Sequence, residues 1–183
     1  HLLGPRPGAD RGDDVSVEHV PVPGWEEPSA VERRTIIEAT STVAMVGVSA
    51  NTARPSNFVA TYLLSSSTDF DMYFVNPTAD EILGRRCYSS LVELPVVPDL
   101  IDVFRRLKDV PAVAADAADI GAKVLWTQFD LWSPDAARIA LDAGMKVVMD
   151  RCLKVEHARF HGGLHLAGFN TGVIDSRRPS SSA

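Results

Sequence analysis

The chain has 183 residues, of which 45% are hydrophobic and 23% are charged, and 18 basic against 24 acidic residues give a formal net charge of -6. This length suits one well-buried α/β domain with a tail and is short for two domains. The acidic balance excludes the basic surface typical of proteins that bind nucleic acid or a membrane surface, so we expect neither partner.

Two cysteines, Cys87 and Cys152, are too few for a disulfide scaffold, and neither lies in a CxxC pair. No stretch approaches the roughly 20 apolar residues needed to cross a bilayer, and the first residues lack the layout of a signal peptide. We therefore expect a reducing, cytoplasmic location.

The first 28 residues hold five prolines and four glycines, a density that predicts an extended or disordered arm. Trp25 is the one residue there with enough apolar area to dock on a domain, so removal of residues 1–24 is expected to leave the melting temperature nearly unchanged. A helix is predicted next, because Ser29 and Glu32 have the spacing of a capping box. Its apolar stripe consists of Ala30, Val31, Ile36 and Ile37.

Residues 43–56 combine an apolar run, a turn of small residues and a helix start. The run from Val43 to Val48 is typical of a central parallel strand buried on both faces. Gly47 supplies a tight turn, and Pro55 suits the first position of a helix. The free N–H groups near Ser56 and the helix dipole favour an anion, so this segment predicts a loop that binds a phosphate-bearing ligand.

Further strands and helices alternate along the rest of the chain. The pattern predicts a helix from Ser56 to about Ser66 with Phe58, Val59, Tyr62 and Leu63 inward, a strand over 72–75, a polar connection over 78–98 with one helical turn at 90–93, a strand over 100–104, a helix over 110–120, a strand over 123–126, a helix from Ser133–Pro134 to Gly144, a strand over 145–149 and a helix over 150–160.

This alternation predicts an α/β fold: a Rossmann-like, doubly wound, five-stranded parallel sheet in the order 3-2-1-4-5 with helices on both faces. We expect the domain to span residues 29–168 and a polar tail to span residues 169–183. Ligands of such sheets bind beyond the carboxyl ends of the strands. That edge gathers five segments, at residues 47–56, 76–77, 104–105, 126–128 and 150–152.

The dinucleotide fingerprint GxGxxG is degenerate here, because its glycine positions hold Gly47, Ser49 and Thr52. NAD binding also calls for an acidic residue after the second strand, where this chain has Asn76. An NADP site would need a cation near this position. Arg85 and Arg86 lie several residues further along the chain, where we expect exposed loop charges. A packing turn without a ligand is the alternative for this loop.

Several side chains are candidates for chemistry. Arg54 lies within the loop, where a guanidinium suits phosphate oxygens, and either Arg105 or Arg106 must face solvent. Cys152 lies beside Arg151 and Lys154, a setting that would lower the pKa of a thiol, although a buried packing role is the alternative.

His157, His161 and His165 recur at intervals of four, but two histidines on one helix face do not complete a metal site, so we expect no bound metal. The chain has no GxSxG, HExxH or complete P-loop motif, so no catalytic residues are predicted and we do not expect an enzyme.

Six short motifs resemble the small bacterial CoA-binding proteins, which are similar to the amino-terminal domain of the succinyl-CoA synthetase alpha subunit. They are GVSANTARPS at 47–56, VNP at 75–77, EILG at 81–84, DVFRR at 102–106, GAK at 121–123 and MDRCLK at 149–154. The resemblance covers about residues 36–168 and implies a Rossmann-type domain that binds CoA or acyl-CoA. It does not imply ligase activity, because the phosphorylated histidine of the synthetase belongs to a further domain.

The resemblance also implies roles for individual residues. Gly47, Ser49, Arg54, Pro55 and Ser56 would hold the pyrophosphate, Asn76, Pro77, Phe104 and Arg105 would flank the adenosine part, and Trp126 to Gln128 would border the pantetheine path. Relatives commonly carry a lysine directly after Asn-Pro, where this chain has Thr78. Our prediction is a non-catalytic CoA-binding protein; an NAD(P)-dependent redox sensor or oxidoreductase domain, and an interaction subunit with a vestigial pocket, are the alternatives. A homo-oligomer or an unidentified protein partner is left open.

Overall fold

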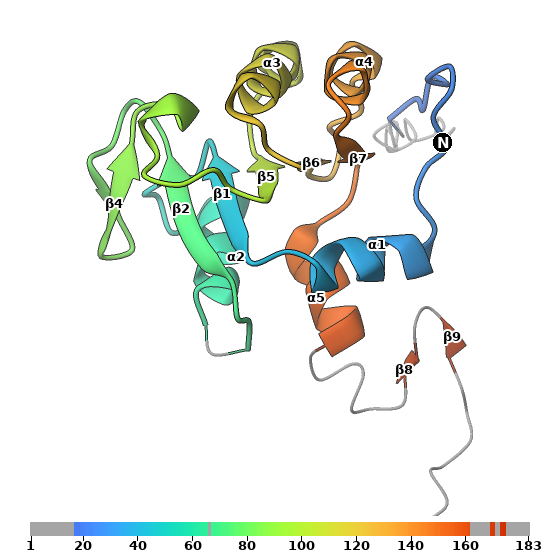
Figure 1. Cartoon of the computed structure of the whole chain (residues 1–183). Helices are drawn as coiled ribbons and strands as arrows, with labels where there is room; N and C mark the ends of the chain where they lie inside the picture. Colours follow the sequence, from blue (N-terminus) through green and yellow to red (C-terminus); the bar gives the residue numbers. More distant parts are fainter. Residues whose placement is uncertain (1–16, 66, 162–168, 171–172, 175–183) are drawn as a thin grey trace, which may run out of the picture.

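The computed structural model describes residues 17–65, 67–161, 169–170 and 173–174. Within these ranges a mostly parallel sheet lies between two groups of helices (Figure 1). The helices are α1 (Ala30–Glu38), α2 (Pro55–Leu63), α3 (Val110–Ile120), α4 (Pro134–Asp142) and α5 (Leu153–His161), with short 3-10 turns at Leu91–Glu93 and Leu107–Asp109. The strands are β1 (Thr42–Val46), β2 (Asp71–Val75), β3 (Glu81–Ile82), β4 (Arg85–Tyr88), β5 (Leu100–Val103), β6 (Val124–Thr127), β7 (Lys146–Val148), β8 (Phe169–Asn170) and β9 (Val173–Ile174).

The Rossmann-like α/β class is confirmed, but the predicted five-stranded sheet in the order 3-2-1-4-5 is wrong. Among the described residues, the main sheet has seven strands in the order β3-β4-β2-β1-β5-β6-β7, and β8 pairs with β9 in a separate two-stranded sheet. The third predicted strand, now β5, pairs with β1 and not with β2. The strand next to β2 is β4, and the two pair in parallel with Phe74 of β2 opposite Cys87 of β4.

The hairpin of β3 and β4 lies in the segment predicted to be a polar connection. Its strands are antiparallel, and Glu81, Arg85 and Arg86 are exposed, so the hairpin lacks the apolar run of a buried strand. Leu83 and Gly84 both have positive φ, 52° and 73°. Two-residue hairpin turns of this kind favour Asn-Gly or Asp-Gly, so a leucine at the first position hides the turn from sequence inspection.

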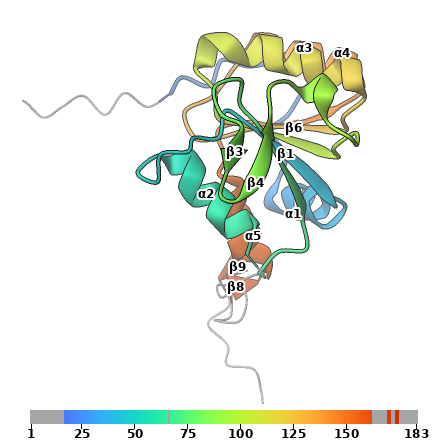
Figure 2. The same ribbon diagram turned by 90° about the vertical axis from the view of Figure 1, so that its left-hand side faces the viewer.

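Alternate residues of the central strands pack on opposite faces of the sheet. Ala44 and Val46 of β1 join the cluster under α3 and α4, whereas Val43 and Met45 join the cluster under α1, α2 and α5. Figure 2 shows the same two layers from the side. Burial on both faces explains the continuous apolar sequence of β1.

The helix ends confirm several predicted caps. Ser29 and Glu32 form a reciprocal capping box at the start of α1, and the Ser133 hydroxyl accepts the N–H of Ala136 at the start of α4. The predicted inward orientation is wrong for two residues, because Val31 is 62% exposed and Phe58 is 66% exposed. In their helices, Arg33 and Ala60 are buried instead, because the helices turn these positions toward the core.

Residues 17–28 have no helix or strand, but they pack against the α4 side of the domain. Trp25 contacts the core as predicted, and its Nε1 donates to the Val147 carbonyl of β7 (3.3 Å). Val22 is buried too, and Trp132 Nε1 donates to the Val20 carbonyl (2.9 Å). The contacts of this segment are therefore not limited to Trp25. Among the described residues, no helix has the length and hydropathy that a membrane crossing requires.

Candidate functional site

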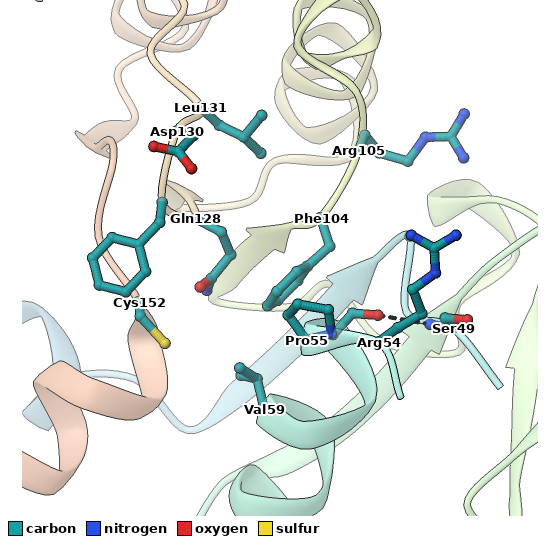
Figure 3. A pocket seen from close by; sticks show the side chains of 13 residues that line it. Ser49, Arg54, Pro55, Val59, Phe104, Arg105, Gln128, Asp130, Leu131 and Cys152 are labelled. Atoms are coloured by element: carbon teal, nitrogen blue, oxygen red, sulfur yellow. Dashed lines mark hydrogen bonds between the residues drawn. The ribbon is translucent and has the colours of Figure 1, made fainter. Parts of the chain in front are cut away.

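A cavity of about 620 Å³ lies at the carboxyl ends of β1, β5 and β6. β1 and β5 are adjacent, and the chain leaves β1 toward β2 on one side and β5 toward β6 on the other, so the cavity lies at the topological switch point of the sheet. Figure 3 shows its side chains. The lining residues are Gly47, Ser49, Arg54, Pro55, Ser56, Val59, Phe104, Arg105, Gln128, Phe129, Asp130, Leu131 and Cys152.

Gly47 allows the strand β1 and the chain after β5 to approach each other closely. It has a φ of 91°, and a Cβ atom on it would lie 2.2 Å from the carbonyl oxygen of Phe104. Its N–H donates to the Val75 carbonyl of β2 (2.9 Å). Only glycine fits there, so the role of this glycine is steric and follows from the approach of a neighbouring strand.

Side-chain hydrogen bonds fix the loop between β1 and α2. The Ser56 hydroxyl accepts the Ser49 N–H (2.9 Å), and Asn57 Nδ2 donates to the Ser49 carbonyl (2.9 Å). Asn76 Nδ2 donates to the Val48 carbonyl (2.8 Å), while its Oδ1 accepts from the Thr78 N–H (2.9 Å). The Asn76 amide is thus occupied in holding two loops together.

Two arginines line the end of the cavity next to this loop. Arg54 is the N-cap of α2 but makes no side-chain cap, and its guanidinium has no ion pair among the described residues. Arg105 contacts Asp109 at 3.6 Å, and the neighbouring Arg106, whose side chain is 72% exposed and does not line the cavity, contacts the same carboxylate at 3.1 Å. Two guanidinium groups beside an uncapped helix start make this end suited to an anion.

The opposite end of the cavity contains Gln128, Phe129, Asp130 and Leu131. Gln128 Nε2 donates to Asp102 Oδ1 (2.7 Å), a carboxyl group that is fully buried in β5. Asp102 Oδ2 has no hydrogen-bond partner among the described residues. Burial raises the pKa of Asp102 to about 7, and the Gln128 hydrogen bond opposes this rise.

Cys152 lines the cavity, but the expected lowering of its thiol pKa is wrong. Burial is the main cause that raises the pKa of Cys152, and the charge of Asp102 adds to it. The guanidinium of Arg151 points elsewhere, to Glu27 at 2.8 Å and Glu156 at 3.8 Å. Of the two cations that the sequence suggested, only Lys154 lowers the pKa of the thiol, and burial outweighs its charge.

The histidine pair on α5 serves packing and hydrogen bonding. His157 Nδ1 and the Tyr62 hydroxyl are 2.9 Å apart, and the rings of His157 and His161 are 5.3 Å apart. Burial lowers the pKa of His157 to about 4. His165 lies outside the described residues. Within the described ranges no group of three or more histidine, cysteine or acidic side chains could hold a metal ion.

Most residues predicted for the ligand site line this cavity: Gly47, Ser49, Arg54, Pro55, Ser56, Phe104, Arg105 and Gln128. Three do not. Asn76 holds the loops, Pro77 lines a neighbouring hollow with Gly47 and Arg105, and Trp126 is fully buried with its Nε1 bound to the Arg151 carbonyl (2.8 Å). Val59, Phe129, Asp130 and Leu131 were missed, although the last three directly follow a predicted segment. Asp130 has a φ of 68°, a backbone conformation that aspartate tolerates better than most residues.

The family model of a CoA-binding domain matches residues 41–158, which include every residue that lines the cavity. The chain belongs to the CoA-binding domain family. In this CoA-binding domain, the matched region begins just before β1 and ends within α5. It thus contains the whole predicted ligand edge of the sheet.

Known proteins similar to this CoA-binding domain fall into two groups. The uncharacterized protein YneT of Bacillus subtilis is 35% identical over 73% of this chain and 97% of its own length. A solved structure of a hypothetical protein from Pyrococcus horikoshii OT3 is 34% identical, with a TM-score of 0.69 over 78% of this chain and 96% of that one. The ADP-forming acetate–CoA ligase II of Archaeoglobus fulgidus is 33% identical over 44% of this chain, which spans only 12% of that protein.

Proposed function

We propose that this protein binds CoA or an acyl-CoA without catalysing a reaction on it, with the pyrophosphate held beside the loop that follows β1. The observation that carries the proposal is the pair Arg54 and Arg105 facing one cavity at an uncapped helix start. Backbone N–H groups, the helix dipole and guanidinium groups all stabilise phosphate oxygens. Membership of the CoA-binding domain family supports CoA as the source of that phosphate.

The site chemistry favours CoA over NAD as the ligand. An NAD site of this fold uses a carboxylate after the second strand to accept the ribose hydroxyls. Here Asn76 stands at that place, and its amide is occupied by Val48 and Thr78. The raised pKa of the Cys152 thiol supports the non-catalytic part of the proposal, because a protonated thiol is a poor nucleophile at neutral pH.

Replacement of Arg54 by Ala tests the phosphate site. Arg54→Ala should weaken CoA binding by about 1.5–3 kcal/mol, the range for hydrogen bonds to charged groups, which corresponds to a roughly tenfold to hundredfold increase in Kd. The fold should be unaffected, since Arg54 lies in a loop and has no ion pair within the described ranges. Isothermal titration calorimetry with CoA and with NAD measures both the affinity and the preference.

Arg106→Ala is the matched control, because Arg106 has the same charge but does not line the cavity and contacts Asp109 at 3.1 Å. It should change the Kd for CoA by less than about threefold, since exposed charges contribute little. Tight binding of NAD together with no binding of CoA would refute the proposed function. Equal effects of the two substitutions would refute the role of Arg54.

A further inference from the structure

The two ends of the cavity differ in charge. Arg54 and Arg105 lie at one end, on the loop after β1 and the loop after β5. Gln128, Asp130 and Cys152 lie at the other end, on the loop after β6 and at the start of α5 (Figure 3). A ligand that places its phosphates beside the arginines therefore directs its remaining part toward a neutral and acidic end.

The end opposite the arginines has little capacity to stabilise an anion. The Gln128 amide already donates to Asp102 Oδ1 at 2.7 Å, so one of its donors is used. Behind it, Asp102 is completely buried and adds a second carboxyl group close to this wall. The Cys152 thiol is neutral, because burial raises its pKa.

Asp130 gives this end its negative charge. Its side chain lines the cavity, is exposed, and makes no ion pair or hydrogen bond with another described residue. Its N–H donates to Asp150 Oδ1 at 2.7 Å, which holds this residue at its positive φ of 68°. This hydrogen bond therefore holds the backbone of Asp130 in place beside the cavity.

Cations close in sequence to this end are engaged elsewhere. The Arg151 guanidinium contacts Glu27 at 2.8 Å. The Lys154 ammonium lies 5.0 Å from the centre of the Phe58 ring and does not line the cavity. Among the described lining residues, only Arg54 and Arg105 are basic, and both lie at the phosphate end.

We propose that the cavity selects against acyl groups that end in a carboxylate, through Asp130, and accepts CoA with a free thiol or an uncharged acyl group. This inference rests on the proposed function, because it assumes that the phosphates occupy the arginine end. A terminal carboxylate at the other end would meet Asp130 without a compensating cation, and like charges a few ångströms apart repel even in water. An uncharged acyl group would instead meet the apolar surface of Phe129 and Leu131.

The matched ligands are butyryl-CoA and succinyl-CoA, whose acyl groups have the same number of carbons and differ in the terminal carboxylate. Calorimetry should give butyryl-CoA a Kd within about twofold of that of CoA, and succinyl-CoA a Kd about fivefold higher than that of butyryl-CoA, since like charges about 4 Å apart in water repel by about 1 kcal/mol. Asp130→Asn should remove most of this difference while keeping the fold, because asparagine tolerates a positive φ. Asp119→Asn, which removes an exposed carboxylate from α3, should preserve the difference.

Three results would overturn the inference. Equal affinity for succinyl-CoA and butyryl-CoA, with CoA itself bound, would refute the selection and leave the proposed function standing. Discrimination that persists in Asp130→Asn would refute the assignment to Asp130. Failure of CoA and both acyl-CoA species to bind would refute the proposed function, and the inference with it.

Discussion

Individual residues of the site divide into those that contact the cavity and those that shape it. Gly47 does both, because it lines the cavity and lets two chain segments approach, whereas Asn76 joins two loops and Asp102 holds the Gln128 side chain. Sequence inspection found Gly47 and Asn76 because the pattern places them at strand ends. It missed the role of Asp102, since a single acidic residue inside an apolar strand does not indicate which side chain it will bind.

Gly47→Ala tests the steric role of this glycine. The new Cβ would overlap the Phe104 carbonyl oxygen at 2.2 Å, and alanine disfavours the φ of 91°. We expect a loss of about 2–4 kcal/mol in the free energy of unfolding, from overpacking together with backbone strain. Urea denaturation measures it.

Gly121→Ala is the control for this substitution, because Gly121 has a similar φ of 82° but no atom within 4 Å of the added Cβ. Gly121→Ala should lower the free energy of unfolding only through backbone strain, by about 1–2 kcal/mol. A Gly47→Ala protein no less stable than Gly121→Ala would contradict the steric role.

Asp102→Asn tests the buried carboxyl group through the pH dependence of stability. The folded pKa of about 7 is higher than the ordinary value of 3.8. The folded state therefore retains a proton that the unfolded chain releases, so the stability contributed by Asp102 is complete below about pH 4 and is lost as the pH rises to about 7. Asparagine is uncharged and can still accept from Gln128.

The free energy of unfolding of Asp102→Asn, relative to that of the unsubstituted protein, should thus increase by about 2–3 kcal/mol between pH 5 and pH 7.5. Urea titrations at both values measure this difference, in which the opposite contribution of His157 cancels. A difference that does not change with pH would show that Asp102 is ionised in the folded protein.

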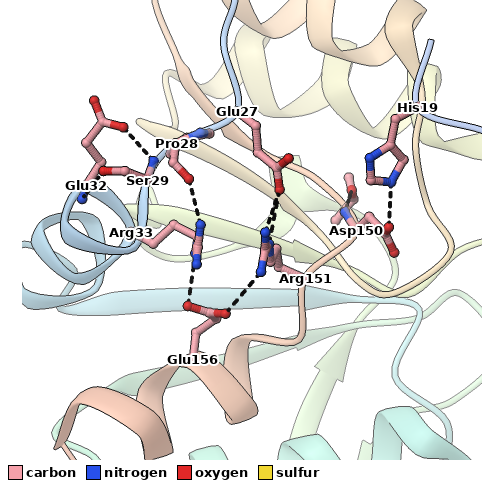
Figure 4. A network of polar contacts seen from close by, with 10 residues as sticks. His19, Glu27, Pro28, Ser29, Glu32, Arg33, Asp150, Arg151 and Glu156 are labelled. Carbon is pink, nitrogen blue, oxygen red and sulfur yellow. Dashed lines mark hydrogen bonds and ion pairs between the residues drawn. The ribbon is translucent and has the colours of Figure 1, made fainter. Parts of the chain in front are cut away.

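At the scale of elements, a network of charged side chains connects α1, α5 and residues 27–28 (Figure 4). Arg33 Nε and Glu156 Oε2 are 2.9 Å apart, and both side chains are almost fully buried. Arg33 also donates to the Pro28 carbonyl (2.6 Å), and Arg151 links Glu156 to Glu27. Because the helices α1 and α5 lie on the same face of the sheet, this network fixes one helix against the other.

Glu156→Ala should destabilise the protein by about 3–5 kcal/mol, because it leaves Arg33 buried without its partner charge. The double variant Arg33→Met, Glu156→Leu should recover most of this loss, since an apolar pair of similar volume carries no unpaired charge. Chemical denaturation compares the two. Arg34→Ala is the control, because it removes an exposed pair with Glu38 and should change the free energy of unfolding by less than about 1 kcal/mol. If Glu156→Ala also changed it by less than about 1 kcal/mol, the proposed role of the network would be contradicted.

Elements with a strong local pattern were predicted well. The helix α3 was predicted with its observed bounds, Val110–Ile120, because Gly121 ends it in a left-handed conformation. The hairpin of β3 and β4 could not be predicted, since its strands are short and charged and Leu83 occupies an unusual turn position. Without β4, the position beside β2 was assigned to the wrong strand, so one missed element accounts for the error in strand order.

At the scale of the whole molecule, residues 17–28 contribute to the domain more than their proline and glycine content suggests. The His19 ring stacks on Trp132 with centroids 3.9 Å apart, Val22 is buried, and Arg138 donates to the Pro23 carbonyl. Sequence inspection missed these contacts because their partners, on α4 and the segment before it, are more than a hundred residues away.

These contacts reverse the expectation for removal of residues 1–24, which should now lower the melting temperature. Val22→Ala is the sharper test and should cost about 2 kcal/mol, the cost of deleting two buried methyl groups. Val20→Ala is its control, because this side chain is 47% exposed and only its backbone carbonyl is bound. Equal melting temperatures of the two variants in differential scanning calorimetry would favour the original expectation.

The hydrogen bond from Trp25 to the Val147 carbonyl has a consequence for self-association. An edge strand with free backbone groups is a template for another chain, and proteins protect such edges against aggregation. Here the β7 edge has a backbone carbonyl occupied by an indole, and the opposite edge is a two-residue antiparallel strand with exposed charged neighbours. Loss of Trp25 would therefore weaken packing and also leave the edge of β7 free to pair with a strand of another chain. A Trp25→Ala protein should form aggregates during prolonged incubation at concentrations where solutions of the unsubstituted chain remain free of aggregate.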